Sequence, residues 1–244
     1  MKPFLFLGTR AEDEAADNEY AAFLHYCGLD EASLERRRLE AGPLGEVDLS
    51  SYSGLILGGG PFNVSDPGDE KSSTQRRVEA ELNALARRVV AADAPFLGAC
   101  YGVGTLGVLE GGLVDRTYGE PVGRAVIRLT EAGRADPVLG GLTDEFEAFL
   151  GHKEAVTRLP DGAVLLATGE RCPVQAFRIG QHVYATQFHP ELDVDGLCTR
   201  IDAYRDYGYF PPGEAASLKE MARASSVTQP ERILGAFVER YRRP

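Results

Sequence analysis

The sequence predicts an α/β protein in which helices flank a mostly parallel sheet, with an antiparallel addition and a helical extension at the C-terminus. Two observations lead to this fold class. In the first hundred residues, short continuous apolar runs, typical of strands buried on both faces, alternate with amphipathic helical patterns. The order strand, helix, strand is the signature of the βαβ unit. In the second half, a hairpin pattern predicts antiparallel strands.

The parallel strands are expected at three apolar runs, "PFLFLG" (3–8), "GLILGGG" (54–60) and "PFLGAC" (95–100). Residues 11–28 predict the helix between the first two runs, with Gly28 just past its end. Residues 72–93 predict the next helix. It begins at capping hydroxyl groups and places four apolar side chains on one face, Val78, Leu82, Leu85 and Val89.

The second half predicts further strands and then helices. The strand patterns are "VGRAVIRLT" (122–130), "CPVQAFRIG" (172–180) and "QHVYATQFH" (181–189), with a hairpin turn at Gly180-Gln181. Helical patterns follow over residues 193–208 and 230–243. We therefore expect a single domain over residues 1–244, with a core of about residues 1–207 and a helical extension of about residues 208–244.

The composition limits the function classes. A net charge of −11 argues against nucleic acid or an anionic membrane as partner, because both require clustered Lys and Arg. No apolar run approaches the roughly 18 residues of a membrane helix, and the N-terminal run is too short for a signal peptide. The four cysteines lack C-x-x-C spacing, so we expect them to be reduced in a cytoplasmic protein.

One cysteine lies in an unusual setting. "GACYG" (98–102) fits G-x-nucleophile-x-G between a strand and a helix, where the nucleophile has a strained backbone and the glycines prevent a clash between the two arms. The helix N-terminus is expected to lower the pKa of the Cys100 thiol, and the N–H of Tyr101 to face a developing oxyanion. The alternative is a buried cysteine that only fills space.

A thiol nucleophile requires a base and a group that orients this base. Among the four histidines, His25 is expected to be packed within a helix and His182 to face solvent beside a turn. In "QFHPE" (187–191), His189 ends an apolar strand and Glu191 follows after a proline, so the imidazole and the carboxylate can share a short stiff turn. Cys100, His189 and Glu191 therefore form a candidate nucleophile, base and orienting group.

The run "LILGGGPF" (55–62) supplies a candidate oxyanion loop. Gly59 and Gly60 are expected to adopt a backbone conformation that turns an N–H group into a cavity. The segment that follows, residues 62–77, predicts a surface loop that either covers the site or only connects to the next helix.

These stretches together resemble the class I, triad-type glutamine amidotransferases. "GGGP" (58–61) is similar to the oxyanion loop of that family, "GACYG" to its nucleophile elbow and "QFHPE" to its His-Pro-Glu element. "GHKEAVTRLPDGAVLLA" (151–167) is similar to the Ser-His-x-Asp segment of the GMP-synthase-type glutaminases. The resemblance covers residues 50–195 well and the N-terminal βα unit loosely.

The resemblance implies a flavodoxin-like fold and hydrolysis of the glutamine side-chain amide without a cofactor or a metal. Cys100 would attack the carboxamide, and His189 would protonate the leaving ammonia. Gly60 and Tyr101 would supply the N–H groups of the oxyanion hole. The remaining substrate contacts would come from Gly59, Gly104, Gly151 and His152.

Two departures from the family pattern affect the prediction. Gly104 stands where most members carry a glutamine that holds the substrate, which weakens the case for glutamine itself. About fifty residues follow Glu191, too few for an ATP-dependent synthetase, so we expect an ammonia-accepting synthetase to be a separate subunit. The alternatives are a cysteine hydrolase of another γ-glutamyl or small amide substrate, and a catalytically inert regulatory protein.

Overall fold

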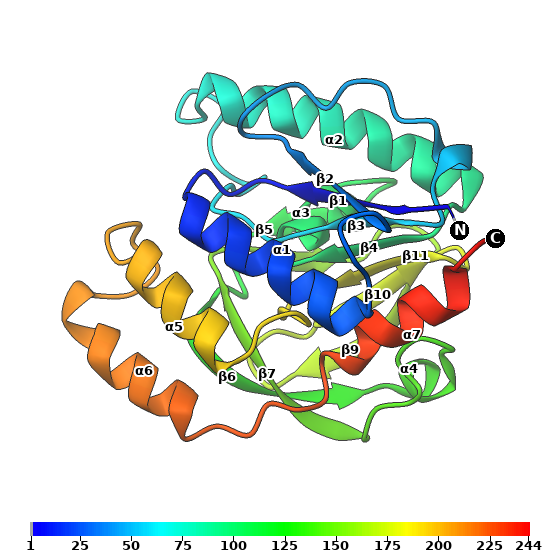
Figure 1. Cartoon of the computed structure of the whole chain (residues 1–244). Coiled ribbons are helices and arrows are strands. Elements are labelled where there is room, and N and C mark those ends of the chain that lie inside the picture. The colour runs from blue at the N-terminus through cyan, green and yellow to red at the C-terminus, as the bar shows by residue number, and fades with distance from the viewer. Residues whose placement is uncertain (1) are drawn as a thin grey trace.

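The computed structural model describes residues 2–244 and contains one large sheet with helices on both faces (Figure 1). The order of its nine strands is β2-β1-β3-β4-β11-β10-β9-β6-β7, and β5 and β8 form a separate ribbon. The first strands are β1 (Phe4–Gly8), β2 (Leu34–Arg38), β3 (Leu55–Leu57), β4 (Phe96–Ala99), β5 (Leu113–Asp115) and β6 (Glu120–Leu129). The others are β7 (Glu145–His152), β8 (Ala155–Arg158), β9 (Val164–Gly169), β10 (Ala176–Ile179) and β11 (Val183–Thr186).

The helices are α1 (Asp13–Cys27), α2 (Ser73–Ala92), α3 (Tyr101–Gly107), α4 (Glu131–Ala135), α5 (Val194–Ala203), α6 (Ala215–Arg223) and α7 (Arg232–Tyr241). The predicted boundaries of the first two are confirmed. Gly28 ends α1 with a φ of 61°, and the Ser72 hydroxyl accepts a hydrogen bond from the N–H of Gln75 at the start of α2.

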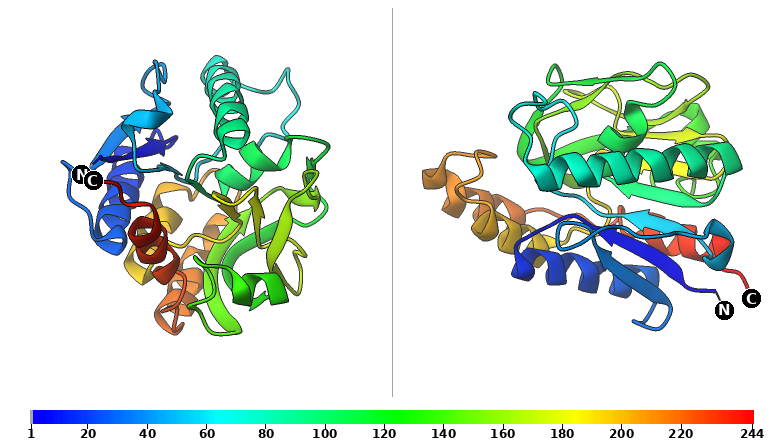
Figure 2. Two further views of the ribbon diagram at one scale, coloured as in Figure 1. Left: turned by 90° about the vertical axis from the view of Figure 1, so that its right-hand side faces the viewer. Right: turned by 90° about the horizontal axis from the view of Figure 1, so that it is seen from above.

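Five neighbouring strands of the sheet are paired in parallel: β2, β1, β3, β4 and β11. Their side chains alternate between the two faces of the sheet. On β1, Phe4 and Phe6 join the core beneath α1 and α7, whereas Leu5 and Leu7 join the core beneath α2 and α3. Figure 2 shows α1 and α7 on one side of the sheet and α2 on the other. Both faces are covered, as the continuous apolar runs predicted.

The antiparallel addition extends the sheet beyond β11. The predicted hairpin pairs β10 with β11, and Gly180 takes up the turn with a φ of 59°. Strands β9, β6 and β7 continue this part antiparallel. Strands β2, β5, β7, β8 and β9 were not predicted; β8 and most of β9 lie within "GHKEAVTRLPDGAVLLA", which was interpreted as a motif and not as strands.

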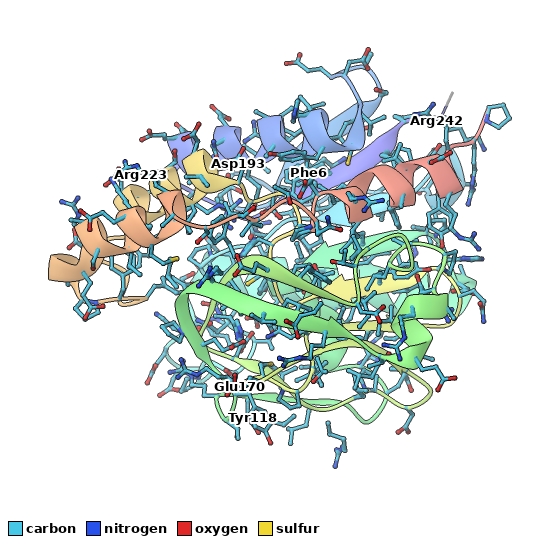
Figure 3. The ribbon with its side chains drawn as sticks, turned by 90° about the horizontal axis from the view of Figure 1, so that it is seen from below. Phe6, Tyr118, Glu170, Asp193, Arg223 and Arg242 are labelled. Carbon is cyan, nitrogen blue, oxygen red and sulfur yellow. The ribbon has the colours of Figure 1, made fainter. Side chains whose placement is uncertain are left out.

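The C-terminal residues do not form a separate layer. Ile233, Leu234 and Phe237 of α7 are fully buried in the same core as Phe4 and Phe6. The expected division at about residue 207 is therefore not seen in the packing, because α7 belongs to the central core. Figure 3 shows α5 and α6 side by side at the edge of the molecule, where Asp193 and Arg223 are labelled.

Two further expectations concern location and redox state. None of the helices within residues 2–244 combines the length and the hydropathy that crossing a bilayer requires. All four cysteines are free thiols, as expected from their spacing.

Candidate active site

Cys100 lies on the tight turn between β4 and α3. Its φ of 50° and ψ of −84° are rare for a residue with a side chain, and its N–H donates to the carbonyl of Thr186 at 2.8 Å. A Cβ at Gly98 would lie 2.7 Å from the Cα of Gly102, so the two arms of the turn approach too closely for a side chain there. A Cβ at Gly102 would meet only Leu57, at 3.9 Å. Of the two glycines in "GACYG", only Gly98 is therefore required to prevent a clash between the arms of the turn.

The Cys100 thiol is protonated in this environment. Burial raises its pKa to about 12, and the carboxylates of Glu191 and Glu154 act in the same direction. The guanidinium groups of Arg10 and Arg200 oppose this shift without cancelling it. The lowered pKa expected for this thiol is therefore wrong, because desolvation by burial is the largest influence on it.

His189 and Glu191 form a hydrogen-bonded pair. Nδ1 of His189 lies 2.8 Å from Oε1 of Glu191, and both side chains are buried. Arg200 completes the group: its Nη2 donates to the same Oε1 at 2.7 Å, and its Nη1 lies 2.9 Å from Nδ1 of His189. Nδ1 donates to Glu191 in one imidazole tautomer and accepts from Arg200 in the other, so the two neighbours favour opposite tautomers.

The same contacts set the protonation states. Burial lowers the pKa of His189, and Arg200 and Arg10 lower it further, although Glu191 opposes them. Burial alone would raise the pKa of Glu191, but His189 and Arg200 hold this pKa far below its usual range. The resting site thus contains a neutral thiol, a neutral imidazole and a carboxylate.

A second buried ion pair supports the glycine loop. The Oε1 of Glu19, on α1, accepts from Arg10 Nε at 3.0 Å and from the N–H of Gly59 at 3.1 Å. It also lies 3.3 Å from Arg200 Nη2. Burial disfavours the Arg10 charge, but Glu19 and Tyr204 more than compensate and raise its pKa. The sequence predicted no role for Arg10 or Glu19, because both stand among other charged residues in "TRAEDEAADNE" (9–19) and nothing local distinguishes them.

Gly59 and Gly60 are required for space and not for an unusual backbone angle. Neither has a positive φ. A Cβ at Gly59 would lie 2.5 Å from Cε1 of His189, and a Cβ at Gly60 would lie 2.0 Å from the hydroxyl of Thr9. The expected conformational reason is therefore wrong: Gly59 instead lets the loop lie against the imidazole of His189, and Gly60 lets it lie against Thr9.

Two cavities meet at Cys100. The larger contains about 510 Å³ of empty space that opens to solvent, and the smaller about 310 Å³. Both are bordered by Gly60, Cys100, Gly151 and Tyr209. His189 and Arg200 belong to the wall of the larger cavity, whereas Tyr101 and Glu154 belong to the wall of the smaller one. Cys100 therefore faces a separate space on each side.

Glu154 fills the place next to Gly104. A Cβ at residue 104 would lie 2.8 Å from Oε1 of Glu154 and 3.2 Å from Val64. The two carboxylate oxygens accept from the N–H groups of Val64 and Ser65 at 2.9 and 2.8 Å. Burial raises the pKa of Glu154, although these two hydrogen bonds partly offset the shift. Glu154 thus anchors the start of the loop over residues 62–77 beside the smaller cavity.

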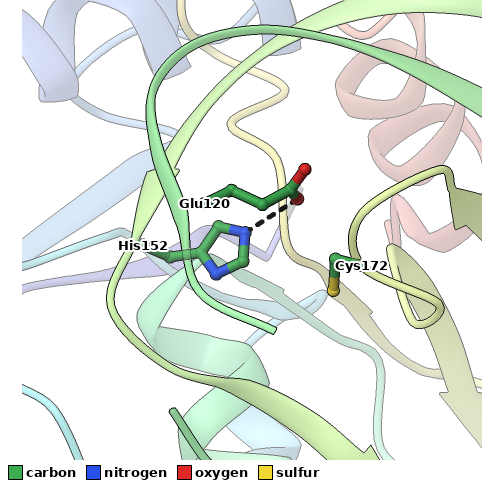
Figure 4. A group of neighbouring side chains, drawn as sticks. All are labelled: Glu120, His152 and Cys172. Carbon is green, nitrogen blue, oxygen red and sulfur yellow. Dashed lines mark hydrogen bonds and ion pairs between the residues drawn. The ribbon is translucent and has the colours of Figure 1, made fainter. Parts of the chain in front are cut away.

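His152 borders the smaller cavity, and its side chain lies beside those of Glu120 and Cys172 (Figure 4). Its Nδ1 donates to the carbonyl of Glu154 at 2.8 Å, and its Nε2 lies 3.1 Å from Oε2 of Glu120. Gln175 donates to the same oxygen at 2.7 Å. The imidazole is thus held at both ring nitrogens. Gly151 borders both cavities next to this cluster.

Two groups of side chains contain metal-binding residue types. Cys172 lies near Glu120 and His152, and Glu19 lies near His189 and Glu191. In the first group the histidine and the glutamate are already hydrogen-bonded to each other. In the second group the Arg200 cation occupies the position between the carboxylates, which disfavours a metal ion there.

The other two histidines differ from expectation. His25 is exposed and packs only the edge of its ring against Tyr26, because it lies on the outer face of α1. His182 is half-buried, and its Nδ1 lies 3.0 Å from the hydroxyl of Tyr241 on α7. Neither borders the two cavities.

Comparison with known proteins agrees with this geometry. The family model "Glutamine amidotransferase class-I" matches residues 23–195. A GMP synthase (glutamine-hydrolysing) from Phenylobacterium zucineum is 32% identical over 193 residues, which cover 73% of this chain and 34% of that protein. The corresponding enzyme from Porphyromonas gingivalis strain W83 is 33% identical over 146 residues, 59% of this chain and 26% of that protein. The chain thus spans about a third or less of the length of these relatives.

Solved structures share the fold over the whole chain. A glutamine amidotransferase from Thermotoga maritima superposes with a TM-score of 0.75 at 20% identity, covering 99% of this chain and 98% of that one. A glutamine amidotransferase from Methylobacillus flagellatus gives a TM-score of 0.71 at 19% identity, covering 100% and 97%. The matched family model spans most of the chain and includes Cys100, His189 and Glu191. This chain belongs to the class-I glutamine amidotransferase family.

Proposed function

We propose that the chain hydrolyses the side-chain amide of L-glutamine through Cys100, His189 and Glu191 and releases glutamate and ammonia. One observation carries this proposal. The cysteine on the strained turn borders the same cavity as an imidazole whose Nδ1 lies 2.8 Å from a buried carboxylate. This is the arrangement of nucleophile, base and orienting group that amide hydrolysis requires.

The protonation states favour attack by a neutral pair. The thiol pKa is raised and the imidazole pKa is lowered, so the proton passes from Sγ to Nε2 of His189 as the carbon–sulfur bond forms. The N–H groups of Gly60 and Tyr101 are proposed to stabilise the oxyanion. His189 then protonates the leaving nitrogen, the C–N bond breaks, and ammonia departs. A γ-glutamyl thioester remains on Cys100.

Water completes the reaction. His189 takes a proton from the water molecule as the oxygen attacks the thioester carbonyl. The carbon–sulfur bond then breaks, the sulfur regains its proton from His189, and glutamate is released. Glu191 stabilises the imidazolium that forms in each half-reaction, because the carboxylate remains ionised throughout.

The smaller cavity is proposed to hold the α-carbon end of the substrate. The carboxylate of Glu154 suits the α-ammonium group, and Oε1 of Gln187 has no hydrogen-bond partner within residues 2–244. The backbone of Gly151 and His152 would supply further contacts. Gly59 would not, because its N–H donates to Glu19, its carbonyl accepts from Thr9 and it borders neither cavity. Gly104 contributes by leaving room for Glu154, and not by a side chain of its own.

The fate of ammonia is a further part of the proposal. The relatives named GMP synthase match this chain over about a quarter to a third of their length. We propose that a separate synthetase subunit receives the ammonia. The second candidate function, hydrolysis of another γ-glutamyl amide, is favoured by Gly104 and by the size of the larger cavity.

Covalent capture tests the assignment of the nucleophile. The chain is treated with a glutamine analogue that carries a chloroketone in place of the amide, and the adduct is mapped by mass spectrometry. We expect one adduct on Cys100 and protection by L-glutamine. Adducts on Cys198 that glutamine does not suppress, with none on Cys100, would refute the proposal. His189→Ala serves as a second variant and is expected to slow the labelling.

A further inference from the structure

The larger cavity lies on the side of Cys100 where the leaving group must depart. A general acid has to reach the nitrogen that leaves, and His189 is in the wall of this cavity. Glu154, the counter-ion proposed for the α-ammonium group, is in the wall of the other cavity. A γ-glutamyl amide bound across Cys100 therefore places its acyl chain in the smaller cavity and its nitrogen substituent in the larger one.

This cavity is larger than ammonia requires. Ammonia is about the size of a water molecule, which occupies roughly 30 Å³ in the liquid. About 50 Å³ of the cavity can take the centre of a water-sized molecule, whereas a single such molecule needs roughly 10–15 Å³ of this space. The cavity therefore has room for a substituent of a few carbon atoms beside the leaving nitrogen.

The wall of the larger cavity is predominantly apolar. It is formed by side chains of β6, β7, α5 and the segments that flank α5: Val122, Leu150, Leu192, Leu197, Ile201 and Phe210. An apolar group that enters such a space leaves water, which favours binding by about 0.8 kcal/mol per buried methylene group.

The charges at the same wall are already paired. Arg10 and Arg200 both border the cavity, and their partners are Glu19 and Glu191. Two guanidinium groups and two carboxylates cancel each other, so the wall offers no net charge to an ionic substituent. The cavity therefore suits an uncharged group.

Residues after α5 form part of the wall of this space. Tyr204 accepts a hydrogen bond from Arg10 at 3.0 Å, and the hydroxyl of Tyr209 lies 3.4 Å from the carbonyl of Pro61 in the glycine loop. The ring of Tyr204 packs edge-on against the rings of Tyr207 and Tyr209. The chain itself thus covers the leaving-group side of the site with an aromatic segment.

We propose that this cavity binds the N-substituent of secondary γ-glutamyl amides, an uncharged alkyl group of a few carbons, and that the chain hydrolyses such amides. The inference rests on the thioester chemistry of the proposed function. Cys100 Sγ bonds to the amide carbon, the thiol proton reaches the nitrogen through His189, and the C–N bond breaks to release the alkylamine. Water then cleaves the C–S bond, which yields the γ-carboxylic acid and restores the thiol.

Binding to a Cys100→Ala variant tests the inference independently of turnover. Calorimetry compares γ-glutamyl-n-propylamide with L-glutamine. We expect the propylamide to bind at least tenfold more tightly, since each buried methylene is worth roughly fourfold. Equal or weaker binding of the propylamide overturns the inference. The γ-glutamyl amides of γ-aminobutyrate and putrescine carry charged substituents. Tighter binding of either amide than of the propylamide also overturns the inference.

Two matched substitutions on β6 locate the binding effect. Val122 borders the cavity and lies over Gly151, whereas Val126 is exposed on the same strand outside it. In the Cys100→Ala background, Val122→Phe is expected to reduce the propylamide-to-glutamine affinity ratio to threefold or less. Val126→Phe is expected to leave this ratio as in the parent. The same ratio in both variants overturns the assignment to this cavity.

The outcome also separates this inference from the proposed function. In the wild-type chain, release of propylamine at a higher kcat/KM than that for ammonia from glutamine supports both. Glutamine turnover without a preference for the propylamide leaves the glutaminase in place and overturns the cavity assignment. If Cys100 is neither labelled by the chloroketone nor required for any turnover, the proposed function fails, and this inference fails with it.

Discussion

Gly104 and Glu154 share one space beside the nucleophile. A Cβ at residue 104 would lie 2.8 Å from Oε1 of Glu154, whose two oxygens bind the N–H groups of Val64 and Ser65. The side chain expected at position 104 from the family resemblance and this carboxylate are therefore mutually exclusive in the present geometry. A carboxylate from the segment after β7 therefore occupies the space that an amide side chain at position 104 would need.

Gly104→Gln tests this exclusion. The new side chain would displace Glu154 and press against Val64, so we expect the free energy of unfolding to fall by about 1–3 kcal/mol. Urea denaturation measures the change. Gly102→Ala is the control in the same helix, because its Cβ meets only an ordinary contact. In the double variant Gly104→Gln/Glu154→Ala, the loss of stability is expected to be smaller than the sum of the losses in the two single variants, because the glutamine then has room. A loss equal to that sum would show that the two side chains do not compete for the same space.

The raised pKa of Cys100 predicts its reactivity toward a small neutral electrophile. With a pKa of about 12, the thiolate fraction grows about tenfold per pH unit through the neutral and alkaline range. The rate of alkylation by iodoacetamide should therefore rise steadily from pH 7 to pH 10 when measured on Cys100 by mass spectrometry. A plateau near pH 8 would show a low thiol pKa and contradict a thiol that is neutral at rest.

Arg200 is expected to set the pH range of the base. It lowers the pKa of His189, so the imidazole stays neutral at pH values somewhat below 6.5, the usual pKa of a histidine. In Arg200→Met this pKa rises, so the acid limb of the kcat/KM profile should move to higher pH. Removing the guanidinium also takes one partner each from Glu191 and Glu19, which keep His189 and Arg10, and the loss of these charged hydrogen bonds is expected to cost about 1–3 kcal/mol of stability.

The control for this prediction is Arg205→Met, which removes an exposed arginine that pairs only with the surface residue Asp202. Its pH profile should match that of the parent. An acid limb that stays in place in Arg200→Met, or moves to lower pH, would show that Arg200 does not control the imidazole.

The backbone of Cys100 predicts an unusual order of stability. At a φ of 50° a residue with a Cβ is strained, so Cys100→Gly should be more stable than Cys100→Ala by about 1 kcal/mol. Cys198, inside α5, is the control, because glycine there should be about 1 kcal/mol less stable than alanine. Thermal or urea unfolding measures the difference in stability between the glycine and the alanine variant at each position. A difference of the same sign at positions 100 and 198 would contradict the strained turn.

Much of the fold could be predicted because its signals are local. Continuous apolar runs specified β1, β3 and β4, and the Gly180 turn specified the hairpin of β10 and β11. The strand-turn-helix pattern around Cys100 and the stiff turn at Pro190 were equally local. These features depend on residues that are neighbours in the sequence, so a single sequence contains them.

The rest of the site depends on contacts between distant segments. Glu19 on α1 reaches the N–H of Gly59 forty residues later, and Arg200 joins it from α5. The pKa of Cys100 was predicted with the wrong sign, since burial by several elements outweighs the one helix that the sequence shows. Likewise, Gly59 and Gly60 were assigned to the right loop for the wrong reason, because Thr9 and His189 crowd them from outside it.

Turnover of L-glutamine tests the central claim most directly. Ammonia and glutamate are measured for the wild-type chain, Cys100→Ala and the control Cys198→Ala. We predict equal amounts of both products from the wild-type chain and from Cys198→Ala, with a loss of at least about 10³-fold in Cys100→Ala. Wild-type rates in Cys100→Ala would contradict the account, because another group would then carry the reaction.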